Sequence, residues 1–410
     1  MDFLNILARA GGGGSGGGGA GGIIMLPILL FLIITAWWAR RKQIKKTELL
    51  YDEAVARDPQ WDNAIQSATN VFYKFQQDWS DGNVTAMKQY LTPDYYEHMR
   101  LIIQALSQLD RQNKMSDVGL KSSILFNIDD KQRNTEDSFD IEFTASAVDQ
   151  LVDTRTNSVI FTSPPNFTEV WHFDRSGERW LLESIAQVGA EALIEKGLTS
   201  QTVTGDSNSP AVRMIQFANN NNFYFNYDFG WLLLPLRGML FGAASFGRSD
   251  INYHIIGQHK DRLVQFYEYV PIRKDKHTLF ADIRRQLYKP ANITDRCTVA
   301  QAVLPKTYTN ISIRRNYGPK ALARTPRGLN RIQLEGVDFE KYFAVYSTAT
   351  DKVTSFELLN PSFMQQLLDA PYEINVEVVD NLLYLYSFDV NIEYESMMVL
   401  LDYAFNEMKL

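Results

Sequence analysis

The residues of this chain that could do chemistry are few and widely spaced. Its five histidines include His254 and His259, which are five positions apart. A helix places two ligands on one metal ion when they are four positions apart, so this spacing does not predict a metal site. The single cysteine, Cys297, would need a positioned histidine to act as a nucleophile, and the sequence implies none. We therefore expect no bound metal, no cofactor and no catalytic residue.

Three titratable residues lie within aromatic stretches that have the pattern of β-strands. Asp140 and Glu142 alternate with apolar residues over residues 139–143, and His172 lies between two aromatic residues. Successive side chains of a strand point to opposite faces of a sheet. We therefore expect all three polar side chains to face solvent while the aromatic side chains face the core.

A basic stretch lies at residues 314–331. It contains one tyrosine, Tyr317, and therefore offers little for stacking on nucleic-acid bases. We interpret it as a solvated loop, although contact with RNA or lipid headgroups would also fit its charge. The formal net charge of the chain is −7, and we expect no nucleic-acid partner. The basic residues of the stretch are Arg314, Arg315, Lys320, Arg324, Arg327 and Arg331.

The clearest structural element in the sequence is an apolar run at residues 23–39. The run contains no charged residue, and as a helix it would extend about 26 Å, close to the hydrocarbon thickness of a bilayer. Trp37 and Trp38 lie near its end, where aromatic rings settle among lipid headgroups. We predict a retained transmembrane helix, because a cleaved signal peptide would carry its basic residues before the apolar run.

Basic residues crowd the C-terminal side of this run, whereas Arg9 is the only basic side chain before it. The asymmetry predicts a single-pass protein with its N-terminus outside and its later domains in the cytoplasm. Each basic residue near an anionic leaflet adds about 1 kcal/mol of attraction, so we expect anionic lipids as partners. The residues expected to contact them are Arg40, Arg41, Lys42, Lys45 and Lys46.

The segments on either side of the apolar run are simple. Residues 1–22 are glycine-rich and predict a disordered tail. Residues 40–58 predict a basic juxtamembrane helix that Pro59 ends.

Residues 59–187 change from helical to strand periodicity along their length. Apolar residues recur at helical spacing over residues 61–80, and a turn at residues 81–83 leads to a further helix from Asp94 to about Arg111. The period then becomes two, with strands expected at residues 124–128, 139–143 and 180–185, among others. Helices followed by an antiparallel sheet predict an α+β domain.

Several short motifs in this region resemble one family. The most specific is Glu169-Val170-Trp171-His172-Phe173-Asp174-Arg175, and others are Asp58-Pro59-Gln60-Trp61, Leu91-Thr92-Pro93 and Trp180-Leu181-Leu182. They resemble the Tim44-like domain, the C-terminal module of the mitochondrial import-motor tether and of bacterial membrane proteins. The resemblance implies an NTF2-like cone, in which three helices pack on a curved antiparallel sheet.

The remainder of the chain predicts a linker and a second domain. Residues 188–222 are rich in small and polar residues and predict the linker. Residues 231–236 and 239–246 are apolar but too short and broken to span a membrane, so we expect buried strand or loop. Strands, a helix capped by Asn360-Pro361, a hairpin around Asp380-Asn381 and a last helix at residues 393–408 predict an α+β domain over residues 223–410. This half resembles a bacterial membrane-associated domain of unknown function at Leu334-Glu335, Phe339, residues 342–346, Leu359-Asn360-Pro361 and Met364.

These expectations favour a non-enzymatic docking or adaptor protein at the cytoplasmic face of a bacterial inner membrane, with a protein or lipid partner. The NTF2-like fold implied by the resemblance can host an enzyme pocket, where Asp140, Glu142 or His172 would be acid–base candidates. An enzyme acting on a membrane-derived small molecule, and a structural subunit of a membrane assembly, remain the alternatives. The aromatic residues expected to line a ligand or partner pocket are Phe72, Phe75, Tyr96, Trp171 and Trp180.

Overall fold

The computed structural model describes residues 21–131, 136–187, 198–199, 202–203, 210–226, 230–238, 240–241, 251–269, 297–315, 328–334, 338–348, 359–389 and 392–407. The chain divides into two compact units. The first comprises Met1–Met99 and Gln112–Glu191, and the second comprises Arg100–Arg111 and Ala192–Leu410. Both combine helices with antiparallel strands, which confirms the α+β class expected from the sequence.

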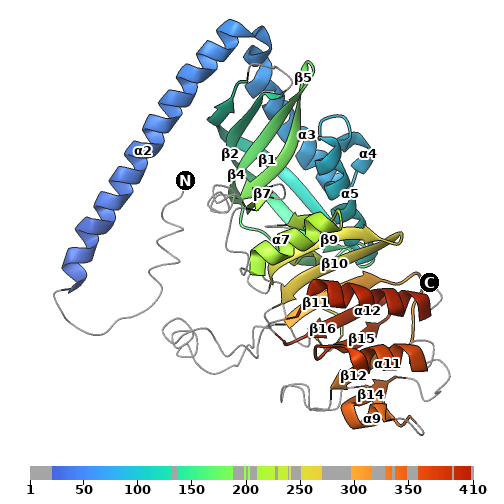
Figure 1. Cartoon of the computed structure of the whole chain (residues 1–410). Helices are drawn as coiled ribbons and strands as arrows, with labels where there is room; N and C mark the ends of the chain where they lie inside the picture. Colours follow the sequence, from blue (N-terminus) through green and yellow to red (C-terminus); the bar gives the residue numbers. More distant parts are fainter. Residues whose placement is uncertain are drawn as a thin grey trace. The chain divides into compact units, whose positions relative to one another are not determined.

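The first element is one continuous helix, α2 (Gly21–Arg57), which Figure 1 draws in blue. It joins the predicted membrane segment to the predicted basic helix without a break and ends before Pro59, as expected. In the part of the chain that the structure describes, no helix is long and apolar enough to cross a membrane. Most side chains of residues 23–39, and all of residues 1–20, lie outside the described set.

Four helical elements follow α2 along the chain. Asp58 caps the first of them by accepting the backbone N–H of Gln60 at 3.0 Å. Gly82 ends the longest one at a φ of 66°, a conformation that glycine adopts without steric cost, and so confirms the predicted turn at residues 81–83. These elements are η1 (Pro59–Asn63), α3 (Ala64–Asp81), α4 (Val84–Met87) and α5 (Pro93–Gln108).

The sheet of the first unit has the strand order β1-β2-β4-β5, with β3 also paired to β2. The prediction placed the first strand at residues 124–128, whereas β1 already begins at Arg111. The helix before it ends early because Asp110 adopts a φ of 57° and reverses the chain. The strands are β1 (Arg111–Asp129), β2 (Ser138–Asp153), β3 (Val159–Thr162), β4 (Asn166–Ser176) and β5 (Arg179–Gln187).

The register of β2 against β4 gives this sheet two different faces. Phe139 pairs with Phe173 and Ile141 with Trp171, and all four are fully buried. The alternate positions carry polar side chains, among them Asp140, which pairs with His172. The expected alternation of aromatic and polar side chains is therefore confirmed.

The second unit is built on a nine-stranded sheet with the order β13-β14-β12-β15-β16-β11-β10-β9-β8. The predicted hairpin around Asp380-Asn381 is the pair β15–β16, and Asn360 caps α11 through the backbone N–H of Phe363 at 2.9 Å. The strands are β8 (Tyr224–Asn226), β9 (Ile251–His259), β10 (Arg262–Tyr269), β11 (Cys297–Val303), β12 (Ile311–Arg315), β13 (Asn330–Ile332), β14 (Phe343–Ser347), β15 (Asn375–Val379) and β16 (Leu382–Ser387).

Four helices of this unit contribute side chains to one core, which also includes the apolar side chains of one sheet face. One of them, α7, lies inside the segment predicted as a linker, together with the short strands β6 (Leu198–Thr199) and β7 (Thr202–Val203). The helices are α7 (Pro210–Asn220), α9 (Phe339–Tyr342), α11 (Pro361–Asp369) and α12 (Tyr394–Glu407).

A second core covers other side chains of the same sheet and includes residues 234, 240 and 241. The apolar segment at residues 231–234 is buried, part of it in the 3-10 helix η3 (Gly230–Leu233). Arg111 holds this segment by donating to the backbone carbonyls of Leu232, Leu234 and Pro235 at 2.9, 2.7 and 3.1 Å.

The interpretation of residues 314–331 as a solvated loop is wrong at its beginning. Arg314 and Arg315 belong to β12, and Arg314 is 2% exposed. The guanidinium carbon of Arg315 lies 4.4 Å from the centroid of the Phe343 ring. Arg331 is exposed on β13, whereas residues 316–327 lie outside the described set.

Candidate functional site

The polar face of the first sheet carries a histidine between two carboxylates. Nδ1 of His172 lies 2.5 Å from Oδ1 of Asp140, and Nε2 lies 3.1 Å from Oδ1 of Asp174. Asp140 comes from β2 and the other two residues from β4, where their spacing of two places them on one face. About a third of the His172 side chain is exposed.

This arrangement decides the charge of the histidine. Burial alone lowers the pKa of His172, but the hydrogen bonds and charges of Asp140 and Asp174 outweigh it and raise the pKa to about 10. His172 is therefore an imidazolium at neutral pH. A cation whose two ring nitrogens both donate to carboxylates cannot accept a proton, so the site does not supply a general base there.

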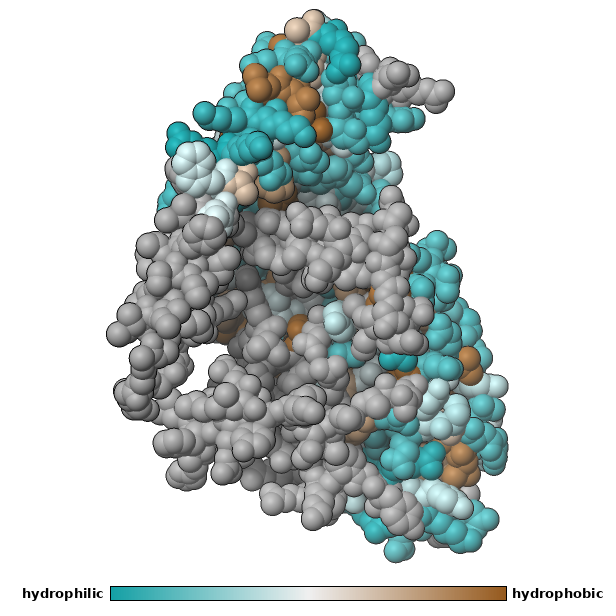
Figure 2. Space-filling model, turned by 60° about the vertical axis from the view of Figure 1, so that its left-hand side comes forward, coloured by the Kyte–Doolittle hydropathy of each residue, from teal (hydrophilic) through white to brown (hydrophobic). Residues whose placement is uncertain are grey.

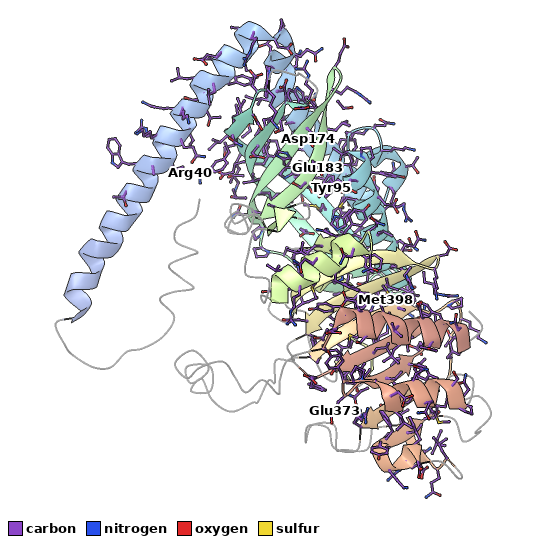
Figure 3. The ribbon with its side chains drawn as sticks, in the orientation of Figure 1. Arg40, Tyr95, Asp174, Glu183, Glu373 and Met398 are labelled. Carbon is purple, nitrogen blue, oxygen red and sulfur yellow. The ribbon has the colours of Figure 1, made fainter. Side chains whose placement is uncertain are left out.

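Glu183 of β5 lies beside this cluster. Burial raises the pKa of Glu183, and the charge of Asp174 adds to the shift. Its carboxylate accepts a hydrogen bond from the hydroxyl of Thr92, which also accepts the backbone N–H of Tyr95 in the first turn of α5. Figure 3 shows the labelled Asp174, Glu183 and Tyr95 side chains in one region of the first unit.

Glu142, on the same face, does not point into solvent as expected. It is 2% exposed because α2 packs over it. Nη2 of Arg40 donates hydrogen bonds to both of its carboxylate oxygens, at 2.5 and 2.6 Å. Arg40, which the sequence assigned to anionic lipids, thus contacts the sheet. Two further contacts hold α2: the Thr47 hydroxyl donates to the carbonyl of Phe126 in β1 at 3.2 Å, and Arg57 pairs with Asp130, the residue after β1.

The opposite side of α2 carries the remaining predicted lipid contacts. Trp38 and Leu49 are 63% and 65% exposed, and Lys42 and Lys45 lie between them at helical spacing. At about 100° per residue these four side chains share one face, roughly opposite that of Arg40 and Thr47. Arg41 and Lys46 are also exposed, one on either side of this face. We call these six side chains the basic–aromatic face of α2.

Four of the five predicted pocket residues form the aromatic interior between sheet and helices. The Trp171 ring lies 5.3 Å from both Phe72 and Phe75, and the Trp180 ring lies 4.6 Å from Trp61. Phe72 and Trp171 are fully buried. The rings therefore pack against one another as a core.

Tyr96 lies apart from this interior. It is half-buried, and the ammonium of Lys88 lies 6.0 Å from its ring. The neighbouring Tyr95 is the buried residue instead.

Most of the first unit matches a known family. Residues 48–187 match the family model of the Tim44-like domain. This part of the chain is a Tim44-like domain. Residues 293–387 match a second model, that of a protein family of unknown function, DUF3137. No curated protein matches the chain.

Two solved structures are similar at low identity. The mycobacterial trehalose monomycolate transport factor A, TtfA, is 14% identical, with a TM-score of 0.33 over 48% of this chain and 92% of that one. The intermembrane space region of the chloroplast protein ARC6 is 16% identical, with a TM-score of 0.24 over 30% of this chain and 96% of that one. Likenesses at this level carry no conclusion about function.

The arginine that ends the most specific motif of the Tim44-like domain is structural. Arg175 is 8% exposed, and its guanidinium donates to Asp58 at 2.5 Å, Asp137 at 2.8 Å and Gln60 at 2.6 Å. It therefore joins the end of α2 to the β4–β5 hairpin. The backbone N–H of Gln60, assisted by Arg175, lowers the pKa of Asp58.

Sequence reasoning named Asp140 and His172 but missed two members of their cluster. The spacing of two between His172 and Asp174 on one strand was a usable signal. Glu183 joins the cluster where the β4–β5 register shifts between His172 and Phe173, and no sequence pattern shows such a shift.

Two other chemical candidates, His254 and Cys297, are buried in the second unit. Among the described residues, no group of three or more His, Cys, Asp or Glu side chains could hold a metal ion. Burial raises the pKa of the Cys297 thiol, which makes it a poor nucleophile. Burial lowers the pKa of His254 to about 4, and its ring lies between the amides of Asn226 and Gln265 at 2.8 and 2.9 Å.

Proposed function

We propose that this chain is a membrane-tethered, non-enzymatic docking protein. A single span at residues 23–39 would hold the Tim44-like domain at the cytoplasmic face of a bacterial inner membrane, with the N-terminus outside. The observation that carries the proposal is the continuity of α2, which runs from Gly21 to Arg57 and is attached to the sheet through Arg40 and Thr47. The helix that contains the apolar run is thus also attached to the sheet of the domain.

The basic–aromatic face supports contact with anionic lipids. It begins at Trp38, directly beside the apolar run, and its side chains point away from the sheet. Each cation within reach of an anionic headgroup would add about 1 kcal/mol of attraction. Arg40 is excluded from this role because its guanidinium is engaged by Glu142.

The aromatic interior of the domain is packed ring against ring and does not support docking inside it. An acyl chain or partner helix that entered between sheet and helices would have to part the rings of Phe72, Phe75 and Trp171. The proposal therefore places the first contact with a partner on the surface. Figure 2 shows mostly hydrophilic side chains on the described part of one face, with hydrophobic ones in separate patches.

The enzymatic alternative has less support. It requires a histidine or carboxylate that is free to accept a proton. Asp140 and His172 are paired with each other, and Glu142 is paired with Arg40.

Crosslinking in intact cells tests the docking role. The full chain should recover one defined protein or lipid partner, and a variant lacking residues 1–39 should recover it in much smaller amount. Equal recovery by both forms, or none above background with the full chain, would overturn the proposal.

A further inference from the structure

The strand β1 lies at the edge of the first sheet, and side chains cover part of its outer backbone. Ser80 of α3 covers Met115: its hydroxyl accepts the Met115 N–H at 3.0 Å and lies 3.4 Å from the carbonyl oxygen. The hydroxyl of Tyr73 accepts the N–H of Leu120 at 3.4 Å, and Thr47 donates to the carbonyl of Phe126. Natural proteins protect sheet edges in such ways because an open edge can pair with another strand.

The side chains that cover the edge, Ser80, Tyr73 and Thr47, are called its caps here, and they leave one stretch of the edge uncovered. Along β1 the backbone N–H and C=O groups point alternately toward β2 and away from the sheet. Asp117 adopts a φ of 53°, which shifts this alternation by one residue. After the shift, Leu120 and Phe126 both direct backbone groups away from the sheet. Ser122 and Ile124 have the same parity and must do likewise. Among the described residues, their outward N–H and C=O groups have no partner.

We propose that residues 121–125 of β1 bind an extended segment of a partner protein as an added antiparallel strand. The proposal rests on the docking function proposed above and assigns the docking to this stretch of β1. The caps at Leu120 and Phe126 are about 20 Å apart, which admits a strand of about five residues. A second copy of this chain would bring its own α2 and α3 against these caps, so a narrow peptide segment is the occupant.

The side chains of the open stretch define the chemistry of that segment. Lys121 is exposed, and its ammonium donates to the neutral amide of Asn166 at 2.5 Å. A partner residue opposite Lys121 is therefore acidic. On the other face of the strand, Ile124 is half-buried and the Tyr73 ring is 45% exposed, so alternate partner residues are apolar.

The first test is hydrogen exchange at residue resolution on the full chain in detergent micelles. The outward amides of Ser122 and Ile124 should exchange rapidly, whereas the inward amides of Ser123 and Leu125 should be protected by pairing with β2. Equal protection of both sets would show a closed edge and overturn the proposal.

The second test uses a synthetic eight-residue peptide in which valine alternates with glutamate and threonine. It should protect the Ser122 and Ile124 amides, and a backbone N-methylated version should not. Ser122→Pro removes only an outward donor and should weaken peptide binding about tenfold with little change in melting temperature. Ser123→Pro, the matched control, removes a pairing donor and should lower the melting temperature.

Peptide binding that is unchanged by Ser122→Pro, or protection that appears elsewhere on the chain, would overturn the proposal. These assays are independent of membrane attachment. If the tether fails, the chain leaves the membrane with its edge binding intact, so the two failures are distinguishable.

Discussion

Arg40 and Glu142 are separated by 102 residues, yet Nη2 of the arginine lies 2.5 and 2.6 Å from the two carboxylate oxygens of the glutamate. The Glu142 side chain is 3% exposed and the Arg40 side chain 20%. This ion pair fastens β2 to the residue of α2 that directly follows the apolar run. It links the predicted anchor to the Tim44-like domain.

Because only the carboxylate is fully buried, the two halves of this pair are not equivalent. Arg40→Met leaves a buried carboxylate without its cation and should lower the free energy of unfolding by about 3 kcal/mol. Glu142→Gln leaves an arginine that can turn toward water and should cost about 1 kcal/mol. Urea unfolding of the full-length variants in micelles measures both losses. Equal losses would show that the pair is not buried in this asymmetric way.

The stability contributed by His172 should depend on pH above neutrality. Its folded pKa of about 10 exceeds the ordinary value of 6.5, so the contribution is complete below 6.5 and is lost as the pH rises toward 10. Because a third of the side chain is exposed, we expect about 1 kcal/mol after solvent screening. Nuclear magnetic resonance titration of the His172 ring should give a midpoint well above 8, and His172→Gln should abolish the alkaline loss. A midpoint near 6.5 would contradict the two-carboxylate geometry.

His254 should show the opposite sign in the second unit. Burial lowers its folded pKa to about 4, so its contribution is present above pH 6.5 and is lost as the pH falls toward 4, by at most about 3 kcal/mol. Comparing the unfolding free energy of the wild type and His254→Gln between pH 7 and 4.5 tests this. The variant should have the shallower pH dependence; parallel curves would show that His254 does not titrate as described.

Two tyrosines of the second sheet should respond differently to removal of the hydroxyl group. The hydroxyl of Tyr267 donates to Gln301 at 2.8 Å, so Tyr267→Phe should cost about 1 kcal/mol. The hydroxyl of Tyr384 is buried and has no hydrogen-bond partner among the described residues, so Tyr384→Phe should be neutral or raise the melting temperature. Tyr267→Phe is the matched control. A larger loss from Tyr384→Phe than from Tyr267→Phe would contradict the assigned hydrogen bonds.

Local signals in the sequence were sufficient wherever a short segment determines its own structure. The cap at Asn360, the turn at Gly82 and the hairpin at Asp380-Asn381 depend on a few neighbouring residues, and each is confirmed. The early start of β1 was missed because this edge strand is mostly half-exposed and is shifted by Asp117, which weakens its alternation.

The candidate site could be predicted only in part because its contacts join distant segments. Strand alternation placed Asp140 and His172 on one face, but it gave no sign that α2 would cover Glu142. Helical spacing likewise selected Tyr96, one residue from the buried Tyr95, because both lie near the boundary of the inward face of α5.

The most direct test of the tethering claim is the topology of the full chain in bacterial membranes. A reporter placed after Leu410 should fluoresce when it is a cytoplasmic fluorescent protein and should be inactive when it is alkaline phosphatase. The chain should also stay in the membrane fraction after a carbonate wash. Active phosphatase at this position, or release of the chain by carbonate, would contradict the account.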